Sequence, residues 1–553
     1  MERTESGLRA GAAERAIPVK RAVFLVGLFA TLLGAFVRLA PALASDFPVN
    51  DGGLFHVFVQ EIQAADYRLP LYSSYNQAAI PFLYPPLSFY LTGLLSSLTG
   101  ARLLDLVRYL PPFVSILTIP AVHLLARKLM KSEITAAAAS VCFALLPTAF
   151  DFMIVGGGLP RAFGFLFCIL TLYQAAELYS TGRRSRLVAT AIFASLTVLS
   201  HPVVAWFMVY SLAILFIFLG ASRRALVSTV VIGAVTCLLT SPWWVTCIAR
   251  HGLDPFLSAF QAGTRSWSAV LAPFLFLQTN EPYLTLQGVF ALLGLFVSLR
   301  RRDYLLPAWL AAVFLFETRL TATYAALPTA LLAGLGFGDV VLRGLARPQS
   351  NPTEGGPGRT TELSPALARR ALPMPATGGW VVLLATGYFL VYMLIAAFLA
   401  APREALPQSQ RKSMQWIRSA TQAGSQFAVV SGIRLAGIDY VSEWFPALTD
   451  RVSLATPQGY EWFPGQVFDT RWDLHTDLQD CVHREVRCLE DWAARGQTAY
   501  THVYLAKDAS FAGDTGAPEG LYRSLLSSPD YEVIYDQEGV AIFAYHPALS
   551  PSP

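Results

Sequence analysis

Long apolar runs alternate with short polar segments over the first 400 residues of the chain. Because about 20 apolar residues in a helix span the hydrocarbon core of a bilayer, these runs predict transmembrane helices. The run over residues 187–220 has cationic clusters at both ends, so we interpret it as two helices that turn at His201 and Pro202. The pattern predicts about eleven crossings, at residues 22–39, 103–126, 134–150, 161–179, 187–220 (two), 225–247, 284–299, 304–316, 322–342 and 380–400.

One further apolar segment, residues 82–99, does not fit this alternation as a crossing. If it crossed inward, the next helix would run outward and leave Arg127, Lys128 and Lys131 on the outer side, against the positive-inside rule. We therefore predict a helix that lies in the outer leaflet. Three prolines near its start indicate a broken entry.

The charges of the loops give the predicted orientation. Residues 1–21 carry five cationic side chains and form a cytoplasmic tail, so the first helix exits outward. Its run is too long for a usual signal peptide, and a retained anchor is expected. The loop 41–80 then lies outside, with four acids against one arginine.

Composition supports this assignment. Of the 553 residues, 54% are hydrophobic and 14% are charged, and the mean hydropathy is +0.46. Soluble domains are about a quarter charged, so the chain is expected to be a multi-pass protein of the plasma membrane. The net charge of +4 is spread over short loops, which sets orientation and gives no reason to expect nucleic-acid binding.

The last part of the chain has a different character. Residues 346–378 are rich in Pro and Gly and predict a cytoplasmic linker, and residues 379–401 predict the last transmembrane helix. Residues 402–553 are less apolar and contain short strand patterns, at 427–432 and 502–506 and in the hairpin YEVIY/VAIFAY near the end. We expect an extracytoplasmic α/β domain there.

Two of the six cysteines, Cys481 and Cys488, lie in this last part and are expected to pair if it faces an oxidising compartment. Within one regular helix their Cα atoms would be about 10 Å apart, too far for a disulfide. The sequence leaves the pairing open.

The stretch DFPVNDGGLFHVF, residues 46–58, is where the first apolar span gives way to carboxylates. Asp51 precedes two glycines, which let a backbone approach a ligand closely. Asp51 is therefore the first candidate for a reaction centre. Its alternative role is the N-cap of a helix that starts there, and Asp46 is expected to be a loop acid.

Further polar residues are expected at the same membrane face. Residues 302–317 would span about 22 Å as a helix, against a core of about 30 Å, so Glu317 and Arg319 should lie below the surface. Ionisable groups at that depth are candidates for function, although a simple ion pair between these two is the alternative. For His201 the alternative is packing at a proline turn. The remaining candidates are Asp151, Glu281 and Arg161, the last after the glycine run GGGLPR.

These features together resemble a known class. The acidic loop after a first helix, the segment YPPLSFYLTGLL and the helix from Arg108 to ARKLM resemble the GT-C class of polyprenyl-phosphate-sugar-dependent glycosyltransferases. DGGLFH followed by FLYPPLSFY is most similar to the branch of membrane proteins related by label to 6-pyruvoyl-tetrahydropterin synthase. The resemblance implies that residues 22–345 form a GT-C-like module in which residues 82–99 are a jaw-type helix.

The resemblance also implies an activity: inverting transfer of a hexosyl or pentosyl group from a polyprenyl-phosphate donor to an acceptor hydroxyl of a lipid, glycan or protein in the cell envelope. Asp51 would be the catalytic base, and the donor phosphate would be bound by Arg319 and Arg161. A divalent cation, Mg2+ or Mn2+, would be held by Asp51 if one is used. The substrate-binding candidates are Glu317, His201, Glu281, Tyr84 and Asp151.

Two other roles compete with this activity. One is a non-catalytic membrane scaffold that presents the outer domain, which would leave the recessed pair Glu317/Arg319 without a purpose. A transporter or flippase of lipid-linked sugars would place acids near the membrane midplane and would show repeated halves, and neither is visible in the sequence. In the glycosyltransferase hypothesis the last domain covers the cavity and selects the acceptor. Glu443-Trp444 and Glu461-Trp462 are candidates there, since aromatic residues beside acids suit sugar binding.

Overall fold

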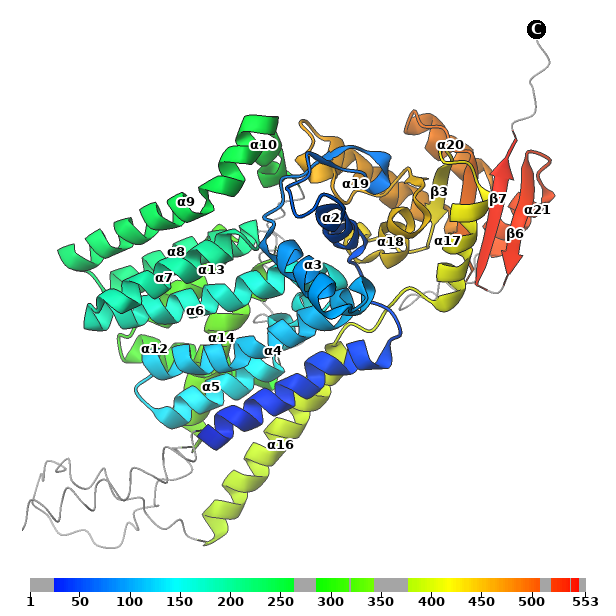
Figure 1. Ribbon diagram of the computed structural model, residues 1–553. Coiled ribbons are helices and arrows are strands. Elements are labelled where there is room, and N and C mark those ends of the chain that lie inside the picture. Colours follow the sequence, from blue (N-terminus) through cyan, green and yellow to red (C-terminus); the bar gives the residue numbers. More distant parts are fainter. Residues whose placement is uncertain are drawn as a thin grey trace, which may run out of the picture.

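The structure is a computed structural model that describes residues 24–262, 285–317, 320–342, 376–507, 519–537 and 539–546. A bundle of helices fills one half of the molecule, and a smaller domain built around a sheet sits at one end of the bundle (Figure 1). We call this the domain-side end. All eleven predicted crossings are helical: Phe24–Ala44, α4 (Leu103–Leu129), α5 (Glu133–Leu145), α6 (Leu159–Thr181), α7 (Arg184–Val198), α8 (Pro202–Leu219), α9 (Arg223–His251), α12 (Leu286–Arg300), α13 (Leu305–Phe316), α14 (Thr321–Leu335) and α16 (Ala376–Ala400).

Six helices within the described ranges are long and apolar enough to cross a membrane by themselves, and α5 makes a seventh if the bent segment after it is included. The chain is thus a polytopic helical membrane protein. The others are shorter, and α13 with 12 residues rises only about 18 Å. α14 is buried on nearly every side and passes through the middle of the bundle core, which explains why its apolar residues show no single stripe.

Three predicted segments differ from the structure in detail. The first helix extends to Ala44 instead of ending at residue 39, and it tolerates Arg38 because that guanidinium donates to the Ser115 hydroxyl and to the Ala144 carbonyl. The predicted crossing 134–150 breaks at Leu145, and the chain bends by 84° into short helical turns that begin at Pro147, as proline requires.

The third difference concerns the predicted interfacial helix over residues 82–99. The helix, α3 (Leu87–Thr99), begins five residues later than predicted. The preceding prolines hold the chain in a short strand and a turn, β2 (Ile80–Pro81), which pairs with β1 (Tyr72–Ser73). The loop 41–80 also contains a second helix, α2 (Gly53–Ala64), which lies between the bundle and the C-terminal domain (Figure 1).

The C-terminal domain contains a five-stranded mixed sheet in the order β4-β3-β5-β7-β6. β3 (Gln426–Val430) is parallel to β4 (Val452–Ser453) and β5 (His502–Ala506), whereas β7 (Val540–Tyr545) is antiparallel to β5 and to β6 (Tyr531–Gln537). These strands confirm the patterns predicted at 427–432, at 502–506 and in the final hairpin.

Helices cover both faces of this sheet. Phe427 and Val429 face α17 (Gln408–Ala420) and α18 (Tyr440–Thr449), and the alternate residues Ala428 and Val430 face the second layer. That layer consists of α19 (Val467–Gln479), α20 (Arg487–Arg495) and α21 (Glu519–Ser527). Burial on both sides explains the unbroken apolar run in β3.

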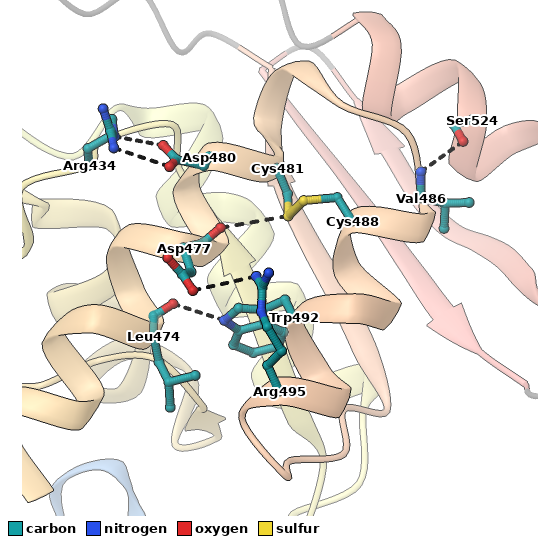
Figure 2. Close-up of a disulfide and its surroundings, with 10 residues drawn as sticks. All are labelled: Arg434, Leu474, Asp477, Asp480, Cys481, Val486, Cys488, Trp492, Arg495 and Ser524. Carbon is teal, nitrogen blue, oxygen red and sulfur yellow. Dashed lines mark hydrogen bonds and ion pairs between the residues drawn. A yellow bond between two sulfur atoms is a disulfide. The ribbon is translucent and has the colours of Figure 1, made fainter.

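Cys481 and Cys488 form a disulfide in this second layer, with their Cα atoms 5.5 Å apart (Figure 2). One regular helix would hold these two Cα atoms too far apart for a disulfide. They come close enough because the chain is not helical between η9 (Asp480–His483) and α20. The loop between these helices is also held by a hydrogen bond from the Val486 amide to the Ser524 hydroxyl at 2.9 Å.

Candidate active site

Asp51 lies at the domain-side end of the bundle, directly before α2. Its carboxylate does not cap that helix, and the N-cap position is Gly52, whose φ of 130° favours glycine. Asp51 Oδ1 instead accepts a hydrogen bond of 2.9 Å from the Gly157 amide. The carboxylate therefore points toward the start of α6, away from its own helix.

The glycine run before α6 is needed for this approach. A Cβ on Gly156 would lie 2.1 Å from the Asp51 carbonyl oxygen, and a Cβ on Gly157 would lie 2.2 Å from Asp51 Oδ2. No side chain fits at either position without moving the loop. GGGLPR and DGG, which are about 100 residues apart in the sequence, thus form one close backbone contact.

Arg161 lies in the first turn of α6, behind Pro160. Its Nη1 donates to the Phe152 carbonyl at 2.8 Å, which fixes the guanidinium near the Asp51 carboxylate. Within the described residues its Nε is buried and has no hydrogen-bond partner. A buried donor without a partner is costly, so a ligand that accepts a hydrogen bond is favoured here.

Aromatic rings line the other side of this cluster. Tyr84 packs edge-on against Phe55 at 5.1 Å, against His201 at 6.0 Å and against Trp462 at 6.1 Å between ring centroids. The Trp462 indole Nε1 is buried without a hydrogen-bond partner among the described residues. The Tyr84 hydroxyl interacts electrostatically with Arg161, Glu461 and Asp51, so these groups share one polar region.

The charges in this region perturb one another. Burial raises the pKa of Asp51 above its usual value, and the positive charge of Arg161 and the Gly157 amide oppose that shift. Burial, together with the charge of Asp51, raises the pKa of Glu443 to about 8. The two carboxyl groups therefore titrate as a coupled pair.

Glu443 comes from α18 in the C-terminal domain and caps α2. Its Oε2 accepts from the Gly52 amide at 2.8 Å and its Oε1 from the Leu54 amide at 3.2 Å. The neighbouring Trp444 indole donates to the Asn50 carbonyl at 2.9 Å. The first turn of α2 is thus closed by a side chain 391 positions further along the chain. The pair Glu443-Trp444 is a candidate from the sequence, but no local sequence pattern predicts that it contacts the start of α2.

The other residues predicted for the site lie in several places. His201 caps α8 by accepting the Val204 amide on Nδ1, so it has a structural role while it also packs on Tyr84. Asp151 begins η3 (Asp151–Met153), which adjoins α6, and accepts the Phe152 amide. Glu317 is buried at the end of α13 and accepts the Leu320 amide at 3.2 Å.

Asp46 lies in the loop before α2, as the sequence predicts. Asp46 pairs with Arg411 of the C-terminal domain, as a loop acid would. Glu281 and Arg319 lie outside the described residues.

The residues present do not form a metal site by themselves. In the parts of the chain that the structure describes, no three His, Cys, Asp or Glu side chains come together. Both oxygens of Glu443 accept backbone amides, and Asp51 Oδ1 accepts the Gly157 amide.

A family model described as the 6-pyruvoyl-tetrahydropterin synthase related domain, a membrane protein, matches residues 82–335. No curated protein matches the chain.

Solved structures of membrane glycosyltransferases share the fold over almost the whole chain. The oligosaccharyltransferase AglB from Archaeoglobus fulgidus, solved with an inhibitory peptide and a dolichol-phosphate, aligns with a TM-score of 0.60 at 15% identity, over 97% of this chain and 75% of that one. ArnT from Cupriavidus metallidurans, bound to undecaprenyl phosphate, aligns at 0.53 and 16% identity, over 96% and 99%. The arabinofuranosyltransferase AftD from Mycobacteria aligns at 0.52 and 14% identity, over 95% and 40%.

These findings confirm the resemblance predicted from DGGLFH and FLYPPLSFY. The chain is similar to GT-C glycosyltransferases and to the 6-pyruvoyl-tetrahydropterin-synthase-related membrane proteins, and it has the GT-C fold with a C-terminal sheet domain.

Proposed function

We propose that the protein is an integral-membrane glycosyltransferase that moves a sugar from a polyprenyl-phosphate donor to an acceptor hydroxyl, with inversion at the anomeric carbon. The observation that carries the proposal is the position of Asp51. It is a carboxylate of raised pKa, held by Gly157 next to Arg161, at the domain-side end of a GT-C bundle. The solved relatives include one with dolichol-phosphate and one with undecaprenyl phosphate, which supports a lipid-phosphate donor.

In the proposed reaction Asp51 takes the proton of the acceptor hydroxyl while the acceptor oxygen bonds to the anomeric carbon. The bond from that carbon to the phosphate oxygen breaks, and the polyprenyl phosphate leaves with the electron pair. A base is needed because an alcohol is a poor nucleophile. A pKa raised toward neutrality by burial makes a carboxylate a stronger base.

Arg161 is the donor-phosphate residue that the described geometry supports best. Its Nε has no hydrogen-bond partner among the described residues, and its charge would stabilise the phosphate as negative charge develops on the leaving oxygen. Tyr84, His201 and Trp462 form an aromatic wall beside it that suits a sugar ring or the first prenyl units. Arg319, Glu317, Glu281 and Asp151 remain proposed contacts to the donor or acceptor.

A divalent cation is proposed with Asp51 Oδ2 as one ligand, and its other ligands would have to come from the substrate phosphate or from residues outside the described parts. The Archaeoglobus fulgidus oligosaccharyltransferase has been solved with Zn and sulfate. Because the described donor set is incomplete, no step of the mechanism above uses a metal.

We infer that the domain-side end faces outward from the cytoplasm. The Cys481–Cys488 disulfide supports this orientation, since disulfides persist in oxidising compartments. The cationic loops at the opposite end, such as Arg183/Arg184 and Arg300/Arg301, agree with the positive-inside rule. No observation favours a flippase.

The proposal is tested by purifying the wild type and Asp51→Asn and measuring transfer of radiolabel from undecaprenyl-phosphate-linked hexose or pentose to a cell-envelope extract. Loss of a general base costs about 10²- to 10⁴-fold, and we expect turnover of the variant to fall within that range while donor binding is kept. Asp66→Asn is the matched control, because Asp66 is an exposed acid of the same loop. Undiminished turnover of Asp51→Asn would remove Asp51 from the mechanism.

A further inference from the structure

A second polar pocket lies at the domain-side end of the bundle, with a volume of about 510 Å3. Its walls come from the loop 46–48, from His56 of α2, from the start of α4 and from α17, so it is bounded by the bundle and by the C-terminal domain. The pocket shares no lining residue with the cluster of Asp51, Tyr84, Arg161 and His201.

The charges that line this pocket are mostly positive. Four cations line it: Arg102, Arg108, Arg411 and Lys412. Two of them are neutralised, since Arg102 pairs with Asp105 and Arg411 pairs with Asp46. In the parts of the chain that the structure describes, neither of the other two lies within ion-pair distance of a carboxylate, although Arg108 also acts electrostatically on Asp46. The lining therefore holds four cations against two carboxylates, Asp46 and Asp105.

Two buried nitrogens in the same lining lack hydrogen-bond partners among the described residues: one is a guanidinium donor, and the other is an imidazole nitrogen that donates in one of its two tautomers. The His56 side chain is 6% exposed, and its Nδ1 has no hydrogen bond to any described residue. Arg411 Nε is likewise buried and unpartnered. Leaving a buried polar group unpaired costs free energy, so both positions favour a ligand that brings hydrogen-bond acceptors.

The pocket adjoins the end of a predicted membrane helix. Arg108 Nε donates to the carbonyl of Ala42 at 2.7 Å, near the end of the membrane helix Phe24–Ala44. Leu103 and Leu104 add apolar wall beside the cations. The volume falls in the usual range of small-molecule sites, about 300–1,000 Å3, and exceeds that of a phosphate ion, so there is room for an attached organic group.

We propose that this pocket binds the phosphate group of an anionic ester at the membrane surface, with Arg108 and Lys412 as its charged contacts and Arg411 and His56 as further donors. Arginine suits phosphate because its guanidinium presents several N–H groups in one plane. The proposal does not depend on the glycosyl transfer proposed above, because it uses none of the residues of that site. The phosphate belongs either to a lipid headgroup or to a soluble phosphate.

The test uses the full-length chain in a neutral detergent at constant ionic strength. Three probes are titrated: inorganic phosphate, dihexanoyl-phosphatidic acid and dihexanoyl-phosphatidylcholine. The thermal unfolding midpoint is measured against the concentration of each probe, since a ligand that binds the folded state raises it. We expect a saturable rise with phosphatidic acid and none with phosphatidylcholine. A tenfold tighter response to phosphatidic acid than to inorganic phosphate identifies a lipid headgroup, and equal responses identify a soluble phosphate.

Variants separate this pocket from other anion sites. In Arg108→Gln/Lys412→Gln we expect the half-saturating concentration to rise at least about tenfold, because two charge-assisted hydrogen bonds are lost. Lys412→Gln alone, at an exposed position, guards against misfolding and should show a smaller rise in the same direction. The control Arg495→Gln/Arg523→Gln removes two exposed arginines of the same domain and should change the response less than twofold.

The proposal is overturned if neither phosphate probe shifts the midpoint. It is also overturned if the shift persists unchanged in Arg108→Gln/Lys412→Gln, which would assign phosphate binding to another place such as Arg161, or if the control variant loses the response equally.

Discussion

Two effects act on the pKa of Asp51 in opposite directions. The surrounding protein disfavours its charged form, while Arg161 and the Gly157 amide favour it. The balance leaves a carboxyl group whose pKa lies above its usual value. If Asp51 is the proposed base, its pKa is set by Arg161 and the Gly157 amide as well as by its own burial.

Arg161→Gln tests this dependence. Removing the cation should raise the pKa of Asp51 further, so the acid limb of the pH–rate profile should move to higher pH. The rate at the plateau should also fall about 10²- to 10³-fold, since the charge on the leaving phosphate loses its partner. The measurement is the pH dependence of kcat for wild type, Arg161→Gln and Arg161→Lys.

Arg161→Lys keeps the charge and should return the acid limb toward its wild-type position, with the rate only partly restored. Arg183→Gln, beyond the other end of α6, serves as the control. An acid limb that stays in place in Arg161→Gln would show that this charge does not set the pKa of the base.

At the scale of elements, the position of α2 determines where Asp51 lies, because Asp51 directly precedes this helix. Its start at Gly53 follows from local signals, since DGG precedes an apolar helical pattern. Four of the five strands of the C-terminal sheet were equally predictable, because FAVVSG and HVYLA are short apolar runs and the final two strands form a hairpin pattern. The cap on α2 was not predictable, because Glu443 and Gly52 meet only through the tertiary fold. The same holds for Gly157 beside Asp51, whose need for glycine shows only when both backbones are in place.

The cap predicts how stability changes with pH. The folded pKa of Glu443 is about 8, above its ordinary value of 4.5, so between these values the folded protein holds a proton that the unfolded chain has released. The stabilisation from this group is complete below about pH 4.5 and is lost as the pH rises through about 8. We expect the thermal unfolding midpoint of the wild type to decline over this window.

In Glu443→Gln that decline should become shallower, because glutamine has no proton to release. The variant should also lose about 1 to 2 kcal/mol, since the amide offers one acceptor where the carboxyl group offered two. Glu490→Gln, at an exposed position on α20, is the control and should keep the wild-type slope. An unchanged slope in Glu443→Gln would assign the pH dependence to other groups.

For the whole molecule, the main arrangement is a helical bundle whose domain-side end is roofed by the loop 41–80 and by the C-terminal domain (Figure 1). Periodic apolar runs and alternating loop charges predicted the helices of the bundle. The bend after α5 depends on its packing against α14, and the position of α13 depends on its packing against α8 and α14. The apolar runs of the sequence therefore predicted these two segments only approximately.

Orientation is tested with single cysteines in a Cys237→Ser background, because the other free cysteines are buried. Ser419→Cys on α17 and Ser185→Cys at the start of α7 are both exposed and lie at opposite ends of the bundle. In intact cells an impermeant maleimide should label Ser419→Cys and should spare Ser185→Cys until the membrane is permeabilised. The reverse pattern would refute the proposed orientation.

The hydrogen bonds from Gly52 and Leu54 to Glu443 have a consequence for biosynthesis. The ribosome makes the loop that carries Asp51 early, yet the residue that closes its helix is added 391 positions later, after every membrane helix has emerged. During that interval α2 lacks the carboxylate that caps its first turn. If Asp51 is the proposed base, transfer activity begins only after the final domain has folded onto α2.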